Sequence, residues 1–209
     1  TMQQSLALKA DGTLVAWGGI HAPPDRAKTG IKAIAGGTDV AIALRTDGTV
    51  VAWGPYIAPA PEGLSNVVEV VAGAQHVAAL KEDGTVVAWG TEPASAGPAP
   101  PGLNGVVKIF SGDQSLFALR ADGRLVAWGS PSDYSHRVPP DLTEVVSVTA
   151  TSSHGLALRR DGTVATWGFG GFPELIQLPA GLTNVVSVAA GNRLSMALKR
   201  DGTIIAWGS

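Results

Sequence analysis

Residues 67–90 read VVEVVAGAQHVAALKEDGTVVAWG, and this stretch decides the fold. It holds three short apolar runs, at 67–72, 76–81 and 85–89, which a Gly-Ala-Gln turn and an Asp-Gly turn separate. Short runs that are rich in valine and bounded by turn residues predict β-strands, because a helix needs a longer amphipathic segment. In the third run both sets of alternate side chains are apolar, which predicts a sheet covered on both faces.

The end of this stretch recurs six times along the chain. The copies are SLALKADGTLVAWG, AIALRTDGTVVAWG, VAALKEDGTVVAWG, LFALRADGRLVAWG, GLALRRDGTVATWG and SMALKRDGTIIAWG, at residues 5–18, 41–54, 77–90, 116–129, 155–168 and 195–208. Their Asp-Gly pairs are 36, 36, 39, 39 and 40 residues apart, and such a period indicates stacked repeats. The sequence therefore predicts an all-β β-propeller of six visible repeats, with blades of three to four antiparallel strands, in a single domain of residues 1–209.

All tryptophans of the chain occupy one position of this repeat. They are Trp17, Trp53, Trp89, Trp128, Trp167 and Trp207. We expect them to pack between neighbouring blades, each burying roughly 150–250 Å². The alternative is a stacking platform for a carbohydrate or a nucleotide.

Only five of the six hairpins follow a strand rich in valine or isoleucine. These strands begin near Ile31, Val67, Val106, Val145 and Val185. We therefore expect the first repeat to lack its inner strand. The open alternatives are a fragment of a longer array, an incomplete blade, or a strand supplied by a partner chain. An unpaired strand edge would also favour self-association.

The composition narrows the classes of function. The formal net charge of −2 gives no electrostatic basis for binding nucleic acid, and the absence of cysteine excludes disulfides and thiolate chemistry. No run of 18 apolar residues is present, so we expect no membrane insertion. The histidines lack metal-ligand spacing, and the sequence contains neither a nucleophile elbow nor a phosphate-binding loop. We expect no cofactor, no metal and no enzyme activity, and structural hydrogen bonds for His76 and His154.

Strand polarity sorts the loops onto the two ends of the sheets. The Trp-Gly face carries the residues after each Trp-Gly pair and the short turns before the second strand of each repeat, and the Asp-Gly face is the opposite end. A Lys or Arg stands two residues before each turn aspartate, which predicts a solvated rim whose aspartates hold their turns, or else a mildly basic edge. The repeats differ on the Trp-Gly face, and variable loops on a rigid scaffold are typical of recognition. The candidate partner-binding residues there are Tyr56, Tyr134, His136, Phe169, Phe172, Asp113, Gln114, Asn192 and Arg193.

The pattern GAQHVAAL at 73–80, DGTV at 83–86 and WG at 89–90 resembles the regulator of chromosome condensation repeat, and the resemblance covers all six repeats. The repeat sequence is most similar to those of short-repeat bacterial members of the family, which include a propeller-type β-lactamase inhibitory protein. The resemblance implies a propeller fold but says little about function, because the family includes an exchange factor, an inhibitor and light sensors. The long loops of the exchange factor are missing, which disfavours that activity. The family's histidine position holds His76 and His154, but the other repeats have Gln4, Val40, Ser115 and Leu194 there.

We therefore expect a non-enzymatic module that binds another protein through the Trp-Gly face. Inhibition of a bacterial enzyme is one form that this binding could take. One alternative is a spacer repeat from a larger bacterial surface or secreted protein. Another is a glycan-active or glycan-binding propeller, for which Asp39, Glu92, Asp113 and Asp133 would have to converge. A secreted or cell-surface bacterial location is favoured.

Overall fold

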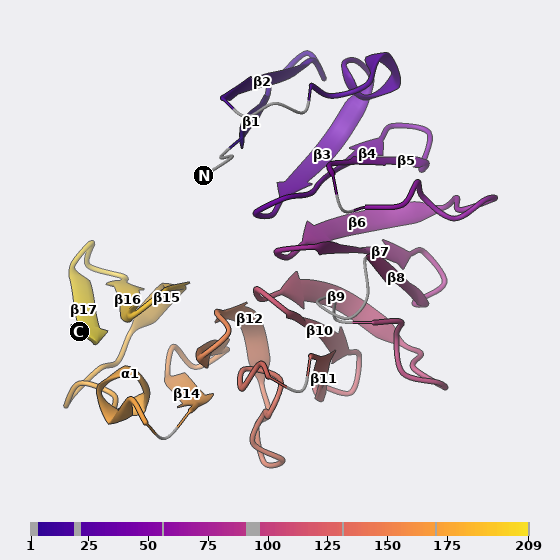
Figure 1. Ribbon diagram of the computed structural model, residues 1–209. Coiled ribbons are helices and arrows are strands. Elements are labelled where there is room, and N and C mark those ends of the chain that lie inside the picture. Colours follow the sequence, from indigo (N-terminus) through magenta and orange to yellow (C-terminus); the bar gives the residue numbers. More distant parts are fainter. Residues whose placement is uncertain are drawn as a thin grey trace. The chain divides into compact units, whose positions relative to one another are not determined.

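The computed structural model describes residues 4–18, 22–55, 57–90, 97–130, 132–169 and 171–208. Within this part of the chain the strands form six antiparallel sheets, one from each sequence repeat (Figure 1). The first sheet has two strands, β1 (Gln4–Leu8) and β2 (Leu14–Gly18), and the other five have three. The all-β propeller prediction is confirmed, and so is the missing strand of the first repeat.

The three-stranded sheets follow each other in chain order. They are β3 (Ile31–Gly36), β4 (Ala41–Arg45) and β5 (Val50–Trp53); β6 (Val67–Ala72), β7 (His76–Lys81) and β8 (Val86–Gly90); β9 (Val106–Ser111), β10 (Ser115–Arg120) and β11 (Leu125–Gly129); β12 (Val145–Ala150), β13 (His154–Arg159) and β14 (Val164–Gly168); and β15 (Val185–Gly191), β16 (Leu194–Lys199) and β17 (Ile204–Gly208). In each of them the second strand lies in the middle.

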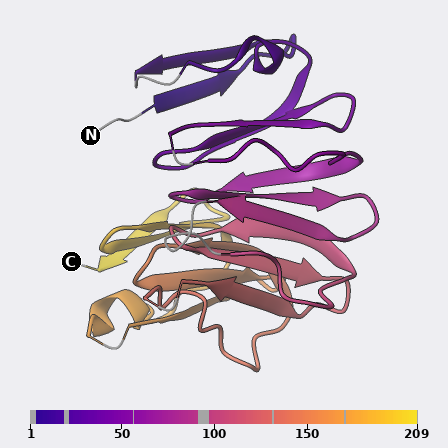
Figure 2. The same ribbon diagram turned by 45° about the vertical axis from the view of Figure 1, so that its right-hand side comes forward.

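The chain divides into two compact units, residues 1–109 and residues 110–209. In the first unit successive sheets share apolar clusters, and Figure 2 shows the sheets that contain β4 and β7 lying one on the other. In the second unit Phe117 packs with Val145 and Trp167, and Leu156 packs with Val185 of the following sheet. The single domain spanning 1–209 stays a prediction.

Each inner sheet buries both faces because alternate residues of its central strand enter different clusters. In β4, Ile42 and Leu44 pack with Val67 of the next sheet, whereas Ala41 and Ala43 belong to the cluster of the preceding sheet. Ile42 and Leu44 are completely buried, and burying a side chain of this size contributes about 1.5–3 kcal/mol. The two-sided coverage predicted from the third strand is thus found in the second strand as well.

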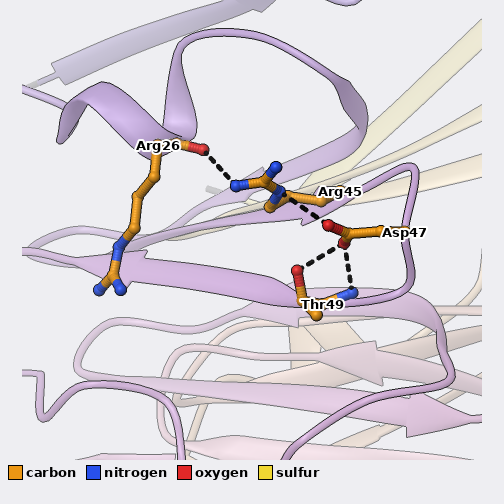
Figure 3. A network of polar contacts seen from close by, with 4 residues as sticks. All are labelled: Arg26, Arg45, Asp47 and Thr49. Atoms are coloured by element: carbon orange, nitrogen blue, oxygen red, sulfur yellow. Dashed lines mark hydrogen bonds and ion pairs between the residues drawn. The ribbon is translucent and has the colours of Figure 1, made fainter.

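The Asp-Gly turns have the same hydrogen bond in all six repeats. The aspartate Oδ1 accepts the main-chain N–H of the residue two positions further on, at 2.9–3.1 Å. Figure 3 shows Asp47, which also accepts the hydroxyl of Thr49 and pairs with Arg45 at 3.4 Å, while Arg45 donates to the carbonyl of Arg26. In the equivalent turn the bonds from Thr85, assisted by Lys81, lower the pKa of Asp83 to about 2. The predicted rim of turn-holding aspartates is confirmed.

The six tryptophans differ in how deeply they are buried. Trp53, Trp128 and Trp167 are buried, Trp89 and Trp207 are half-buried, and Trp17 of the first sheet is 55% exposed. The prediction of core packing therefore holds for five of the six and is wrong for Trp17. Trp17 belongs to β2 of the two-stranded first sheet.

Three of these indoles also hold a connecting segment. The Nε1–H group donates to a main-chain carbonyl 31 or 32 residues earlier in the sequence. The pairs are Trp89 with Ala58, Trp167 with Ser135, and Trp207 with Leu175. Each acceptor lies after the Trp-Gly pair of the preceding repeat, so the repeated tryptophan anchors the loop that varies.

In the second to sixth repeats the glycine after the tryptophan leaves no room for a side chain. A Cβ atom would lie 2.5 Å from the carbonyl oxygen of the short turn beside it, that of Gln75 for Gly90 and that of Gln114 for Gly129. Such a distance is far below van der Waals contact, so only glycine lets the two backbones approach. This contact brings the residues after Trp-Gly next to the short turns and confirms how the loops were sorted.

Two short helical turns lie in the connecting segments and were not predicted. They are the 3-10 turn η1 (Asp25–Ala27) and the single α-turn α1 (Pro173–Ile176), which contacts β14 and β17. Pro173 is the first residue of α1, where its fixed φ suits a helix, and Pro24 directly precedes η1. In the described part of the chain no helix has the length and apolar character needed to cross a membrane.

Candidate partner-binding surface

Three variable loops of the second unit meet on its Trp-Gly face. The segment after β11 is tied to the β12–β13 turn by a hydrogen bond from the Tyr134 N–H to the Ser152 carbonyl at 3.0 Å. The segment after β14 is tied to the same turn by a bond from the Phe169 N–H to the Ser153 carbonyl at 2.8 Å. One short turn therefore positions two aromatic side chains from different repeats.

The aromatic side chains of these loops form a continuous row. The ring of Tyr134 lies 4.7 Å from that of Phe169, and the ring of Phe169 lies 5.7 Å from that of Phe172, measured between centroids. An arginine lies over the ring at each end, Arg137 over Tyr134 and Arg193 over Phe172, each with its Cζ 4.7 Å from the centroid. The row thus has the order cation, three rings, cation, and it draws on three loops.

A buried carboxylate holds the first loop in place. Asp133 is completely buried and accepts the main-chain N–H groups of Ser135 at 2.7 Å and Gln114 at 3.2 Å. The buried hydroxyls of Ser135 and Ser115 lie 2.6 Å apart, and the Ser135 carbonyl accepts the indole N–H of Trp167. Because both neighbours of Tyr134 are buried and bonded, this ring has little freedom to leave the row.

The second loop is fixed by packing at its glycine and at its end. A Cβ atom on Gly171 would overlap the ring of Phe169, so the missing side chain lets that ring lie against the backbone. The Phe172 carbonyl accepts the Leu175 N–H at 3.0 Å, and the Leu175 carbonyl accepts the Trp207 indole at 3.2 Å. The loop is therefore built from the tight turn α1 and one anchoring tryptophan.

The exposed groups on this face are cationic and aromatic. Arg137 and Arg193 are both exposed, and Phe169 is 39% exposed. Asp113 is also exposed, but its carboxylate accepts the Ser152 N–H at 3.0 Å. The two arginines are therefore cations that a ligand can reach, while Asp113 keeps an exposed negative charge beside the neighbouring loop.

His154 lies beneath this surface and has a structural role. His154 is completely buried, with Nε2 2.9 Å from the Ser195 hydroxyl and Nδ1 3.1 Å from that of Thr151. Burial lowers the pKa of His154, so the ring is neutral at pH 7. This hydrogen bond between sheets agrees with the structural role predicted for His154. Among the described residues no three His, Cys, Asp or Glu side chains are grouped to hold a metal ion.

The structure places the predicted binding residues in three groups. Tyr134, Phe169, Phe172 and Arg193 form the row itself. Around it lie Asp113 and Gln114 in the β9–β10 turn, which bond to the neighbouring loops, Asn192 beside Arg193, and the half-buried His136 next to Ser135. Tyr56 lies outside the described residues.

Sequence reasoning missed two residues of this surface. Arg137 directly follows the candidate residue His136, and its position three residues after Tyr134 was the available signal. Asp133 was noted only as a possible member of a carboxylate cluster, yet its carboxylate is buried and bonded to main-chain N–H groups. Nothing local in the sequence distinguishes a buried loop aspartate from an exposed one.

Comparison with known proteins agrees with this architecture. Residues 67–92 match the model of the regulator of chromosome condensation (RCC1) repeat, and no curated protein matches the sequence. The structure of yeast RCC1 (Prp20) bound to Kap60 superposes with a TM-score of 0.78 at 21% identity, covering 98% of this chain and 68% of that one. Prp20p from Saccharomyces cerevisiae, reported with its binding to Gsp1p and histones, gives the same TM-score and identity, covering 98% and 69%.

A receptor shares the fold as well. The ectodomain of the Physcomitrella patens receptor kinase CR4 superposes with a TM-score of 0.78 at 22% identity, covering 99% of this chain and 59% of that one. The fold is therefore that of the RCC1-like β-propellers, and residues 67–92 carry an RCC1 repeat. Membership of the short-repeat bacterial subgroup stays a prediction.

Proposed function

We propose that this chain is a non-enzymatic binding protein that recognises another protein through the Trp-Gly face of its second unit. The observation that carries the proposal is the row of Tyr134, Phe169 and Phe172 between two arginines. Tyrosine and arginine are enriched among the residues that dominate protein–protein binding energies. Two of the row's four contacts, Tyr134 with Phe169 and Phe172 with Arg193, join residues more than 20 positions apart in the sequence, so the surface depends on the fold.

The rigidity of the loops supports recognition. The main chain on both sides of Tyr134 is fixed by Asp133 and by the indole of Trp167. A surface that is ordered before binding loses less conformational entropy when the partner arrives. The fold neighbours point the same way, because yeast RCC1 (Prp20) is seen bound to Kap60 and Prp20p is described with Gsp1p and histones. The partner of this chain need not be related to theirs.

The test compares two baits in affinity capture. The full chain and its Tyr134→Ala/Phe169→Ala variant are immobilised at equal density, and the proteins they retain from an extract of the producing cells are quantified by mass spectrometry. We expect at least one protein to be retained by the full chain and to fall roughly tenfold or more on the variant, as truncation of two central aromatic residues predicts.

The matched control is Arg160→Ala, which removes an exposed cation from the opposite Asp-Gly face, where Arg160 pairs with Glu144 at 3.2 Å. This variant should retain the same protein as the full chain. Equal retention by the aromatic variant, or loss on the Arg160 variant instead, would show that the surface is wrongly assigned. An unchanged thermal midpoint of both variants would show that folding is intact.

Three further expectations remain proposals. Tyr56 is proposed to serve the same face in the first unit. An unpaired strand edge is proposed to allow self-association, since the first sheet has only two strands, and light scattering at increasing concentration would detect it. A secreted or cell-surface bacterial location is the third.

A further inference from the structure

The two ends of the aromatic row carry unused positive charge. A guanidinium stacked on a ring keeps its N–H donors in its own plane, where they point away from the ring and can grip a carboxylate. Among the described residues neither Arg137 nor Arg193 forms an ion pair, although most turn aspartates of the Asp-Gly face do have a cationic partner. Both arginines are exposed, so a ligand can reach them.

The separations along the row set an upper limit to the length of a ligand that spans both arginines. Successive separations along the row are 4.7, 4.7, 5.7 and 4.7 Å, which limits the distance between the two guanidinium carbons to about 20 Å. An extended chain advances roughly 3.3 Å per residue. A span of no more than about six residues therefore reaches from one arginine to the other.

The middle of the row selects for apolar side chains. A guanidinium already covers one face of Tyr134 and one face of Phe172. Phe169 contacts both of these rings, at interplanar angles of 45° and 68°. Sugars and nucleobases bind aromatic platforms by stacking flat on an open ring face. The rings are tilted and partly covered, so their exposed edges suit contact with aliphatic side chains.

We infer that the partner presents an extended peptide segment with an acidic residue at each end of a span of at most about six residues and apolar side chains between them. This inference rests on the proposed function, because it names the chemistry of the partner at the same surface. The two carboxylates pair with Arg137 and Arg193, and the apolar side chains lie along the three rings.

Fluorescence anisotropy with synthetic peptides tests the inference on the full chain. The probe is a fluorescein-labelled peptide with acidic ends six residues apart and valine and leucine between. Its matched controls carry amide ends, lysine ends, or acidic ends only three residues apart. Each exposed ion pair contributes modestly, so the peptide with amide ends should bind about fivefold more weakly for each carboxylate lost. The lysine-ended peptide should bind most weakly of all.

Two arginine variants locate the effect. Arg137→Gln and Arg193→Gln should each weaken the acidic peptide about fivefold more than they weaken the amide-ended peptide. The control is Arg200→Gln, because Arg200 is an exposed arginine on the Asp-Gly face of the same unit. It should alter neither affinity. Raising the salt concentration should weaken only the acidic peptide.

Several results would overturn the inference. They are equal affinity of the acidic and amide-ended peptides, no measurable binding of the acidic peptide, and tighter binding of single-stranded oligothymidine or of maltohexaose. If capture of a protein still depends on Tyr134 and Phe169 in that event, the surface stands and only the partner's chemistry is wrong. If capture is also independent of the two rings, the proposed function itself falls.

Discussion

Replacing Trp167 by phenylalanine should destabilise the second unit by about 2–4 kcal/mol. The indole of Trp167 is only 5% exposed and donates its N–H to the Ser135 carbonyl. Phenylalanine has no such donor, and an unpaired buried carbonyl costs about 1–3 kcal/mol. The indole also packs edge-on against Phe117 at 6.4 Å, and the space left by the smaller ring adds about 1 kcal/mol.

The matched control is Trp17→Phe, at the same repeat position in the first sheet. Trp17 is 55% exposed, so its replacement should change the free energy of unfolding by no more than about 0.5 kcal/mol. Urea unfolding followed by far-UV circular dichroism measures both variants without relying on tryptophan fluorescence. Hydrogen exchange over residues 132–137 would show whether the loop that carries Tyr134 has loosened. Equal destabilisation by the two replacements would refute the view that the indole hydrogen bond anchors a loop.

Three more predictions concern the same unit. Asp133→Ala removes the acceptor of two main-chain N–H groups, and we expect about 1–3 kcal/mol of destabilisation and weaker partner binding, measured by thermal unfolding and by capture. Gly168→Ala places a Cβ atom against the Ser153 carbonyl. Its control is Gly181→Ala, because Gly181 also has a positive φ but has open space around it. In urea unfolding, Gly168→Ala should lower the free energy of unfolding by at least about 1–3 kcal/mol more than the control. Burial lowers the pKa of His154. Below about pH 6.5 the unfolded state therefore binds a proton that the folded state does not bind. The free energy of unfolding should consequently fall as the pH drops from 7.5 to 5. The His154→Gln variant should show a shallower fall over the same range, and an identical slope would contradict the assignment.

The strand pattern could be predicted from the sequence because it depends on local signals. The runs at 67–72 and 76–81 match β6 and β7 residue for residue, and the third run differs from β8 by one residue at each end. Valine-rich segments bounded by glycine and Asp-Gly turns leave little choice of conformation. The missing strand of the first repeat followed from the same counting.

The candidate surface could be predicted only in part. The aromatic residues after Trp-Gly pointed to loops that the structure brings together, but the contact between Tyr134 and Phe169 joins residues 35 positions apart and depends on how two repeats stack. The burial of Asp133 was beyond reach for the same reason, since its partners Gln114 and Ser135 come from different segments. Trp17 shows the same limit from the other side. It occupies the same position of the motif as the other tryptophans, but it is exposed because its surroundings in the first sheet differ from theirs.

The indole hydrogen bonds have a consequence for how such a scaffold can diversify. Trp89, Trp167 and Trp207 bind main-chain carbonyls, a group that every amino acid offers. The acceptor residue can therefore be exchanged without losing the anchor, and a loop is free to change its side chains while its path is preserved. A combinatorial library that randomises positions 134, 137, 169, 172 and 193 and keeps the tryptophans would use that freedom. The chain offers a template on which new specificities can be selected with the sheets left untouched.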